Sequence, residues 1–265
     1  MKGIILAGGS GSRLHPLTKV TSKQLLPVYN KPMIYYPLHT LIKAGIKDIL
    51  IIVAPEHSGD FLNFLGSGKD FGVRFAYEVQ DQPRGIAEAF VIGKDFIKGD
   101  SCTLILGDNI YEDDFSEVIR NHKEGAKIFV KKVHDPERFG VVEINENNRV
   151  LSIEEKPKMP KSNLAQTGLY VYDNTVVEHA EKIKPSNRLE YEITDLNNLY
   201  LQEGKLNAEI VEGEWIDAGT FESLHRASVL AREKELGLSP QKPSETIKVT
   251  LNPSSKKTVL MDVNS

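Results

Sequence analysis

The chain has 265 residues, of which 40% are hydrophobic, enough to bury one large domain or two small ones. Its formal net charge of -4 argues against a general nucleic-acid surface, and its single cysteine, Cys102, excludes a disulfide framework and multi-cysteine metal sites. Its apolar runs fall short of the ~18 residues of a membrane span and no signal-peptide pattern opens it, so we expect a cytoplasmic protein with no membrane partner.

The chain opens with a short apolar strand, residues 3–7, that runs directly into a loop with three glycines, residues 8–11. Glycine lets a backbone approach a ligand closely, and successive N–H groups in such a turn can bind an anion. Arg13 and Lys23 follow, so the loop predicts a polyphosphate site, with a flexible turn beside two exposed cations as the alternative. A P-loop would continue with Lys-Ser/Thr, and a dinucleotide fingerprint would need one more glycine.

Helices and strands alternate from there to residue 106. We expect helices over 32–44, 60–65 and 85–96, and strands over 47–54, 73–79 and 102–106. In the first helix Pro32 occupies the first turn, where proline is tolerated, and Gly45 ends it. This alternation predicts a parallel sheet with right-handed crossovers, in which ligands bind at the carboxyl ends of strands. The glycine loop and Asp108 both lie at such ends.

From residue 127 the pattern becomes richer in strands. Strands are expected over 127–133, 140–144, 150–154, 165–172 and 206–211, and helices over 175–183, 192–202 and 222–235. We therefore predict an α/β fold with a Rossmann-like, mostly parallel sheet flanked by helices, in one domain over 1–236. It would have one half over about 1–125 and a β-richer half over about 126–236. Residues 237–265 are predicted to form an appendage, disordered or docked on an edge, with a weak strand at 246–251.

Three ordered motifs resemble the signature of sugar-1-phosphate nucleotidyltransferases. They are residues 8–14 (GGSGSRL), 16–19 (PLTK) and 23–28 (KQLLPV). The resemblance extends to about residue 235 and is strongest to members that use dTTP and glucose-1-phosphate. It implies the nucleotidyltransferase fold, a nucleotide-binding first half and a sugar-binding second half. It also implies the reaction of dTTP with glucose-1-phosphate to give dTDP-glucose and pyrophosphate, the first step of dTDP-rhamnose and deoxysugar biosynthesis.

The resemblance assigns roles to individual residues. Arg13 and Lys23 would be catalytic, Arg13 on the triphosphate and Lys23 on charge that develops as the bond breaks. Nucleotide contacts are implied for Leu6, Gly8, Gly9, Gly11, Ser12, Gln24, Gln80, Pro83 and Gly85. Contacts to the sugar phosphate are implied for Asn109, Gly140, Glu155, Lys156, Thr167 and Arg188. Judged alone, Gln80 fits a polar loop before a helix equally well, and Lys156 fits an exposed surface lysine better.

Asp108 and Asp217 are the predicted ligands of Mg²⁺, a cation bound by one or two carboxylates together with substrate phosphates. A lone aspartate at a strand end is more often a turn or a helix cap. Here residues 106–109 (LGDN) and 215–220 (WIDAGT) are similar to the two metal-binding segments of the family. Two positions depart from the family pattern: Gln166 stands where valine is expected, and Leu189 where many members have glycine.

Alternatives remain open at this point. UTP or CTP could replace dTTP, because the thymine methyl group is worth only ~1 kcal/mol in an apolar pocket. A non-catalytic nucleotide sensor would be expected to lack Arg13, Lys23 or one aspartate, and a nicotinamide dehydrogenase would need the missing glycine. The family typically forms homotetramers, and its longer members carry a helical C-terminal extension that binds a regulatory nucleotide sugar. This chain is shorter, which leaves regulation by end product open.

Overall fold

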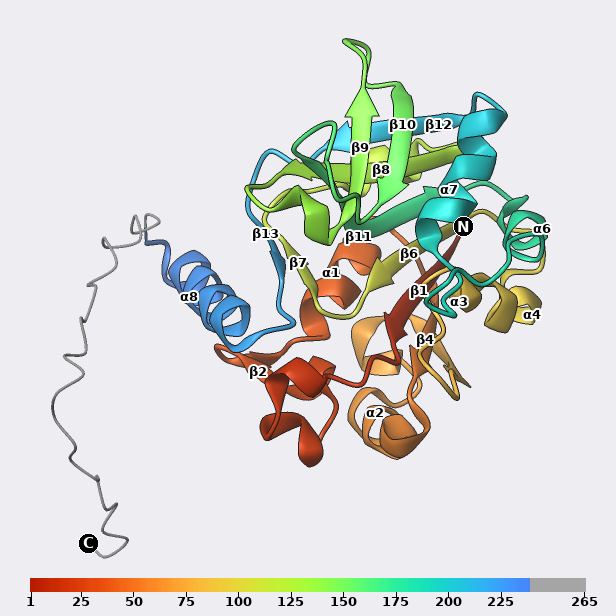
Figure 1. Ribbon diagram of the computed structural model, residues 1–265. Coiled ribbons are helices and arrows are strands. Elements are labelled where there is room, and N and C mark those ends of the chain that lie inside the picture. The colour runs from red at the N-terminus through yellow and green to blue at the C-terminus, as the bar shows by residue number, and fades with distance from the viewer. Residues whose placement is uncertain (239–265) are drawn as a thin grey trace, which may run out of the picture.

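The computed structural model describes residues 1–238, so the strand expected at 246–251 and nearly all of the appendage lie outside the described residues. A nine-stranded sheet forms the centre (Figure 1). Its main path runs β10 (Val150–Glu155), β9 (Gly140–Ile144), β11 (Leu164–Tyr172), β6 (Cys102–Leu106), β1 (Lys2–Ala7), β4 (Asp48–Val53) and β5 (Arg74–Val79). Two further strands, β8 (Ala126–Lys132) and β12 (Leu206–Ile210), join through β11.

Strands β6, β1, β4 and β5 are all parallel, with registers such as Gly3 opposite Ile49 and Thr103. Strand β11 lies antiparallel to β6 and connects the parallel strands to the β-richer part of the sheet. In that part β11 pairs with β8, and β12 pairs parallel with β8. The predicted α/β fold with a central, mostly parallel sheet flanked by helices is confirmed. Both parts of the chain contribute strands to this sheet.

Alternate residues of the sheet point into two separate cores. Ile4 and Leu104 pack in one core, whereas Ile5 and Ile105 pack in the other. The first core is covered by α3 (Glu88–Ile92), α4 (Lys94–Ile97), α6 (Val176–Ala180) and α7 (Ile193–Gln202). The second is covered by α1 (Tyr35–Lys43), α2 (Ser58–Leu65) and α5 (Ser116–Arg120). The fold is thus a three-layer sandwich, with Cys102 fully buried in the first core.

Two short ladders lie outside the main sheet. They pair β7 (Asn109–Tyr111) with β13 (Trp215–Asp217), and β2 (Pro27–Val28) with β3 (Lys31–Pro32). A small third core lies beside them under α8 (Phe221–Leu236), which Figure 1 shows at the margin of the fold. A capping box between Thr220 and Ser223 begins α8, and Gly237 ends it at a φ of 62°. The ladder of β7 and β13 brings the two predicted metal-binding segments together.

The predicted bounds of two helices were wrong. The first was to begin at Pro32, but that residue pairs in β3 and α1 begins at Tyr35. The second was to run unbroken over 85–96, but Gly85 has a φ of 104° and Gly93 separates α3 from α4. Some of the connections contain short 3-10 turns, at Ser12–Leu14, Leu17–Lys19, Lys23–Leu25, Pro55–His57, Lys69–Phe71 and Pro136–Arg138.

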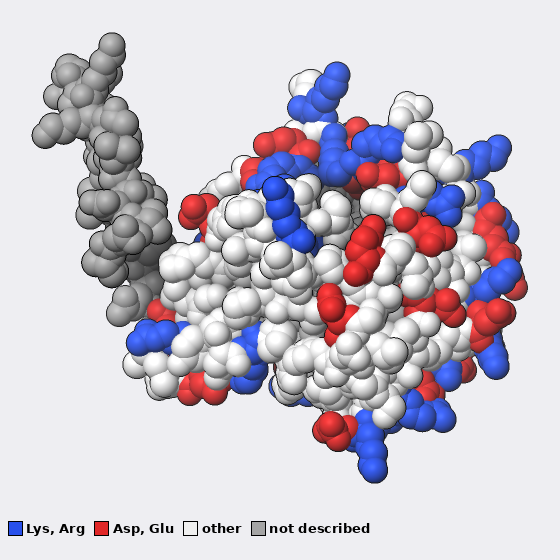
Figure 2. All heavy atoms as spheres, turned by 90° about the horizontal axis from the view of Figure 1, so that it is seen from below, with Lys and Arg blue, Asp and Glu red and all other residues white. Residues whose placement is uncertain are grey.

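The outer surface carries charges of both signs. On the face drawn in Figure 2, Lys and Arg side chains alternate with Asp and Glu, and no large area has a single sign. Within residues 1–238, no helix combines the length and the apolar character that crossing a membrane would require.

Candidate active site

A cavity of about 470 Å³ opens where β1 and β6 end, between the parallel part of the sheet and β9, β10 and β11. Arg13 and Asp217 both line it. On the predicted nucleotide side the lining includes Leu6, Gly9, Gln80, Pro83 and Gly85. On the predicted sugar side it includes Asn109, Gly140, Glu155, Lys156, Thr167 and Arg188. Residues from both halves of the sequence therefore border one space.

The conformation of the glycine loop is set by its own hydrogen bonding and by the side chains packed against it. Gly11 has a φ of 62°, and a Cβ atom there would come within 2.9 Å of the Thr18 side chain. The Thr18 hydroxyl donates to the carbonyl oxygen of Gly11 at 2.8 Å, which closes the loop on itself. At Gly8 a Cβ atom would lie 2.8 Å from Oε1 of Gln80. Any larger residue at Gly8 or Gly11 would clash with the side chains that shape the loop.

Beneath the loop, Lys23 and Asp108 form a buried ion pair. The ammonium group of Lys23 also lies under Gly9, 3.5 Å from where a Cβ atom would be. Burial alone would raise the pKa of Asp108, but the charge of Lys23 and the hydrogen bonds from Lys23 and Asn109 together hold that pKa below its ordinary value. Burial likewise opposes the charge of Lys23, yet Asp108 keeps its pKa above the ordinary value. Both groups are therefore charged at neutral pH.

Asp217 comes beside this pair through the ladder of β7 and β13, in which it stands opposite Asn109. The backbone N–H of Ala218 donates to the carbonyl oxygen of Asp108 at 2.9 Å, which fixes the two segments. Burial first, and then the negative charge of Asp108, raises the pKa of Asp217 to about 6. Its Oδ1 atom is buried without a hydrogen-bond partner among the described residues.

The two carboxylates fit a hard divalent cation. An orphaned, buried carboxylate oxygen next to a second carboxylate is a poor arrangement for a folded protein unless a cation is bound there. No group of three or more His, Cys, Asp or Glu side chains in residues 1–238 is arranged to hold a metal. A pair of oxygen ligands completed by substrate phosphates is the mode that Mg²⁺ favours.

Arg13 reaches the same place from the short turn after the loop. A Cβ atom on Gly219 would lie 2.7 Å from Nη2 of Arg13 and 3.0 Å from Oδ1 of Asp217. The guanidinium group is therefore directed into the cavity next to Asp217, and glycine at 219 leaves room for it. Cations from two sides, Arg13 above and Lys23 below, flank the two carboxylates.

Gln80 borders the other end of the loop with a fixed orientation. Its Nε2 donates to Glu88 at 2.9 Å and to the carbonyl of Gly85 at 3.3 Å, which leaves Oε1 toward Gly8. Gly85 is pressed against the backbone of Tyr191, where a Cβ atom would overlap the main chain. The segment at 191 thereby positions the loop that carries Gln80.

At the sugar side, Glu155 is the centre of a charged network. It accepts from Thr194 at 2.6 Å and pairs with Arg188 at 3.2 Å and with Lys156 at 3.6 Å. Arg188 also pairs with Glu192 at 2.8 Å. The carboxylate is therefore held in place, and Lys156 is the less neutralised of the two cations.

Several predicted residues do not line the cavity. These are Gly8, Gly11, Ser12, Lys23, Gln24 and Asp108. Gln24 is buried against Gly107 and accepts from Ser22 at 2.6 Å. Other lining residues received no role from the sequence, among them Ile86, Leu106, Gly168, Tyr170 and Glu192. Leu106 begins the LGDN segment, and Tyr170 lies four residues after the departure at Gln166, so the sequence held a signal for both.

The chain belongs to the nucleotidyl transferase family, whose model matches residues 2–234. Among curated relatives, a glucose-1-phosphate thymidylyltransferase of Neisseria meningitidis is 56% identical over 86% of this chain and 81% of its own length. Another, of Mycolicibacterium smegmatis, is 51% identical over 92% of this chain and 88% of its own. The predicted resemblance to this family, and within it to glucose-1-phosphate thymidylyltransferases, is confirmed.

Solved structures agree with the fold. A Bacillus anthracis protein, provisionally assigned as a glucose-1-phosphate thymidylyltransferase and crystallised with sucrose, is 52% identical. It covers 91% of this chain and 98% of its own, with a TM-score of 0.83. A UDP-glucose pyrophosphorylase bound to UDP-glucose superposes with a TM-score of 0.75 over 88% of this chain and 98% of its own. At 24% identity that second likeness supports the fold alone.

Proposed function

We propose that this chain transfers a thymidylyl group from dTTP to glucose-1-phosphate, giving dTDP-glucose and pyrophosphate. The observation that carries the proposal is a single cavity lined by Arg13 and Asp217 together with Gly9 of the glycine loop and the residues of the sugar side. Lys23 and Asp108 lie directly beneath as a buried ion pair. Relatives named for this activity share about half of the sequence over most of the chain.

The reaction needs no nucleophile from the protein. An oxygen of the sugar phosphate attacks the α-phosphorus in line, the bond from that phosphorus to the bridging oxygen breaks, and the electron pair leaves with pyrophosphate. Repulsion between two anionic substrates is the main obstacle, so positioning and charge neutralisation carry the catalysis. N–H groups of the glycine loop would hold the triphosphate, Arg13 would brace the leaving pyrophosphate, and Lys23 would stabilise the charge that develops.

Asp108 and Asp217 would hold Mg²⁺, which when bound neutralises phosphate charge. Lys156 would hold the sugar phosphate, since it pairs only with Glu155 within residues 1–238, whereas Arg188 also pairs with Glu190 and Glu192. Arg188 would act chiefly on Glu155, whose carboxylate would accept hydrogen bonds from sugar hydroxyls.

The orientation of Gln80 bears on the choice of base. Its NH₂ group is already bound to Glu88 and Gly85, so it offers an acceptor toward the nucleotide side. Thymine and uracil present an N3–H donor in the plane of the ring, whereas cytosine presents an acceptor at that position. This favours dTTP or UTP over CTP. UTP is the second candidate, because the two bases differ by one methyl group.

The proposal also covers the oligomeric state of the protein, its location in the cell and its pathway, as the resemblance implies them. We infer a homo-oligomer, tetrameric as is typical of the family, working in the cytoplasm at the head of dTDP-rhamnose and deoxysugar biosynthesis. Sedimentation of the purified chain tests the first of these inferences, and a species of one subunit would contradict it.

Pyrophosphate release tests the activity directly. The purified chain would be given each of dTTP, UTP, CTP, ATP and GTP with glucose-1-phosphate, galactose-1-phosphate or mannose-1-phosphate, with Mg²⁺ or with EDTA. We expect the highest kcat/KM for dTTP with glucose-1-phosphate and no turnover in EDTA. Preference for CTP or ATP would contradict the role of Gln80, and preference for GTP or no turnover with any pair would contradict the proposal.

A further inference from the structure

Gln166 lies in the wall of the cavity, on β11, and is 6% exposed. All nine residues of β11 are buried, and its pairing with β8 is irregular between Gln166 and Tyr170. An amide buried in this way must find hydrogen-bond partners, because a buried polar group left unpaired costs about 1–3 kcal/mol. The directions of its N–H donors and of its carbonyl oxygen therefore decide which groups Gln166 can bind.

A chain of buried hydrogen bonds sets the orientation of this amide. The hydroxyl of Tyr172 donates to Oδ1 of Asn197 at 2.6 Å, so Asn197 turns its NH₂ group to Gln166. That group donates to Oε1 of Gln166 at 2.7 Å. The acceptor of Gln166 is therefore occupied on the core side, and its NH₂ group is left for the cavity side.

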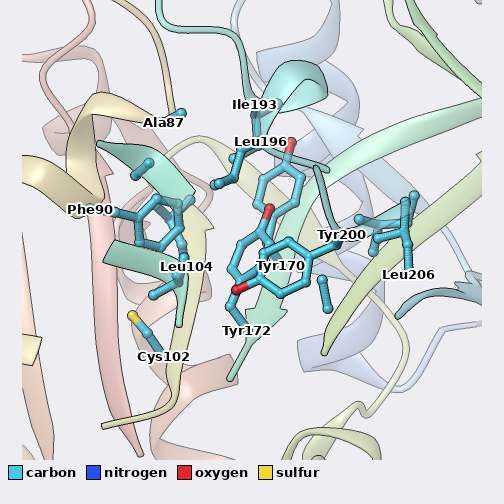
Figure 3. Close-up of a cluster of buried hydrophobic side chains, with 14 of the residues drawn as sticks. Ala87, Phe90, Cys102, Leu104, Tyr170, Tyr172, Ile193, Leu196, Tyr200 and Leu206 are labelled. Atoms are coloured by element: carbon cyan, nitrogen blue, oxygen red, sulfur yellow. The ribbon is translucent and has the colours of Figure 1, made fainter. Parts of the chain in front are cut away.

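The core behind the amide is rigid. Tyr170, Tyr172 and Tyr200 lie together in the buried cluster drawn in Figure 3, with the ring centroids of Tyr170 and Tyr172 6.4 Å apart. The rings of Tyr172 and Tyr200 lie 5.4 Å apart. Packing of this kind fixes rotamers, so the hydrogen-bond chain cannot easily reverse.

The NH₂ group of Gln166 has capacity to spare. It carries two hydrogens, and the structure gives it one long contact, 3.4 Å to the hydroxyl of Tyr170. A Cβ atom on Gly140 would lie 3.3 Å from this Nε2 and 3.1 Å from Oγ1 of Thr194, the donor to Glu155. Gly140 itself stands opposite Glu155 in the β9–β10 ladder. A donor thus lies next to the carboxylate that would accept from the sugar.

We propose that Gln166 is a specificity-determining residue, whose Nε2 donates a hydrogen bond to a hydroxyl oxygen of the hexose. The inference rests on the proposed function and extends it. A hydroxyl group donates once and accepts twice, so an N–H from Gln166 beside the carboxylate of Glu155 is a complementary pair for neighbouring hydroxyls. Valine, expected at this position from the family pattern, offers no such donor.

The test is a set of double-mutant cycles between protein and sugar. We would measure kcat/KM for glucose-1-phosphate and its 2-, 3-, 4- and 6-deoxy analogues with the wild-type chain, Gln166→Met and Gln166→Val. Met keeps the length of the side chain, whereas Val is smaller, so agreement between the two variants separates hydrogen bonding from packing. The KM for dTTP is the internal control and should not change.

We expect one deoxygenation to cost the wild type roughly tenfold, the value of one hydrogen bond near 1.4 kcal/mol, and to cost both variants almost nothing. Equal losses in all three proteins at every position would give Gln166 a structural role and overturn the inference. So would a wild type that tolerates all four analogues within about twofold, a result that requires no variant. Absence of turnover with glucose-1-phosphate itself would instead contradict the proposed function.

Discussion

Asp217 stands across a three-residue ladder from Asn109, so that its carboxylate lies beside that of Asp108. Side chains of the same ladder lock it to the rest of the cavity. Oδ1 of Asn109 accepts from the indole N–H of Trp215 at 2.7 Å and from the backbone N–H of Gly168 at 3.0 Å. One amide oxygen thereby joins the two predicted metal-binding segments to β11, which lines the predicted sugar side of the cavity.

Removing the charge of Arg13 should affect catalysis alone. Its guanidinium lies at the cavity surface beside Asp217 and has no structural ion pair among those found in residues 1–238. Arg13→Ala is expected to lose roughly 10²–10³-fold in kcat, as for loss of one preorganised donor. The unfolding midpoint should stay that of the wild type. Near-normal pyrophosphate release by this variant would contradict the role given to Arg13.

Lys23 should behave differently, because its loss leaves Asp108 buried without a partner. Lys23→Met is expected to lose activity to a similar extent and also to unfold more easily, by about 3–5 kcal/mol in the absence of metal. Mg²⁺ should restore part of that stability. Denaturant unfolding with Mg²⁺ or EDTA measures both effects, and Arg13→Ala is the matched control. A Lys23→Met protein as stable as the wild type in EDTA would be inconsistent with the buried pair.

Asp217 should make the metal-free protein less stable at neutral pH than in mild acid. Its pKa is about 6 in the folded chain, against about 3.9 in an unfolded one. Between these values the folded state binds the extra proton, so stability rises as pH falls from 7 toward 4. The penalty at neutral pH corresponds to about 2–3 kcal/mol for a shift of this size.

Asp217→Asn removes that penalty along with the activity. In EDTA at pH 7.5 the variant should be more stable than the wild type, and at pH 4.5 the difference should nearly vanish. Urea unfolding at the two pH values measures this. A difference of the same size at both would show that the carboxyl does not titrate near 6.

Gly85 should not tolerate a side chain. Its φ of 104° is unfavourable for other residues, and a Cβ atom would overlap the backbone of Tyr191. Gly85→Ala is expected to destabilise the protein by more than about 1 kcal/mol and to raise the KM for dTTP, because the segment next to Gln80 must move. Gly59→Ala is the control, since nothing lies within 4 Å of a Cβ there and its φ is ordinary. Equal behaviour of the two variants would count against this account.

Leu189 should gain from becoming glycine. It is 75% exposed and has a φ of 61°, a left-handed conformation that costs most residues about 1–2 kcal/mol. Leu189→Gly is therefore expected to raise the free energy of unfolding by a few tenths to 1 kcal/mol. The control is Leu151→Gly in β10, where an exposed leucine with ordinary backbone angles should lose stability instead. A destabilised Leu189→Gly would contradict the prediction.

The sequence predicted regular elements best where the local pattern was strong. The strand Cys102–Leu106 was predicted to the residue, because a continuous apolar run is bounded by polar residues and glycine. Pro32 gave a wrong start for the first helix, because proline is accepted both in the first turn of a helix and in a short edge strand. The break near Gly85 depends on Tyr191, which lies far along the chain and leaves no mark on the local pattern.

The site was predicted from motifs rather than from geometry. Motifs singled out Asp108 and Asp217, but a ladder of three residues has too little periodicity to show that they meet. The hydrogen bond from Thr194 to Glu155 also had no local signal, since a threonine near a helix start looks like a cap. Conversely, the sequence alone marked Leu189 as a departure from the family pattern. Its positive φ explains why many members of the family have glycine at this position.

Strand β11 pairs along one edge with β8, and along the other with β9 and with β6, which leads to Asp108. Because these backbone hydrogen bonds join strands from both halves of the chain, the surfaces proposed to bind the two substrates belong to one continuous sheet. The distance between the sugar phosphate and the α-phosphate of the nucleotide would then be set by the sheet. Adjustment to a bound ligand would be left to the surrounding loops.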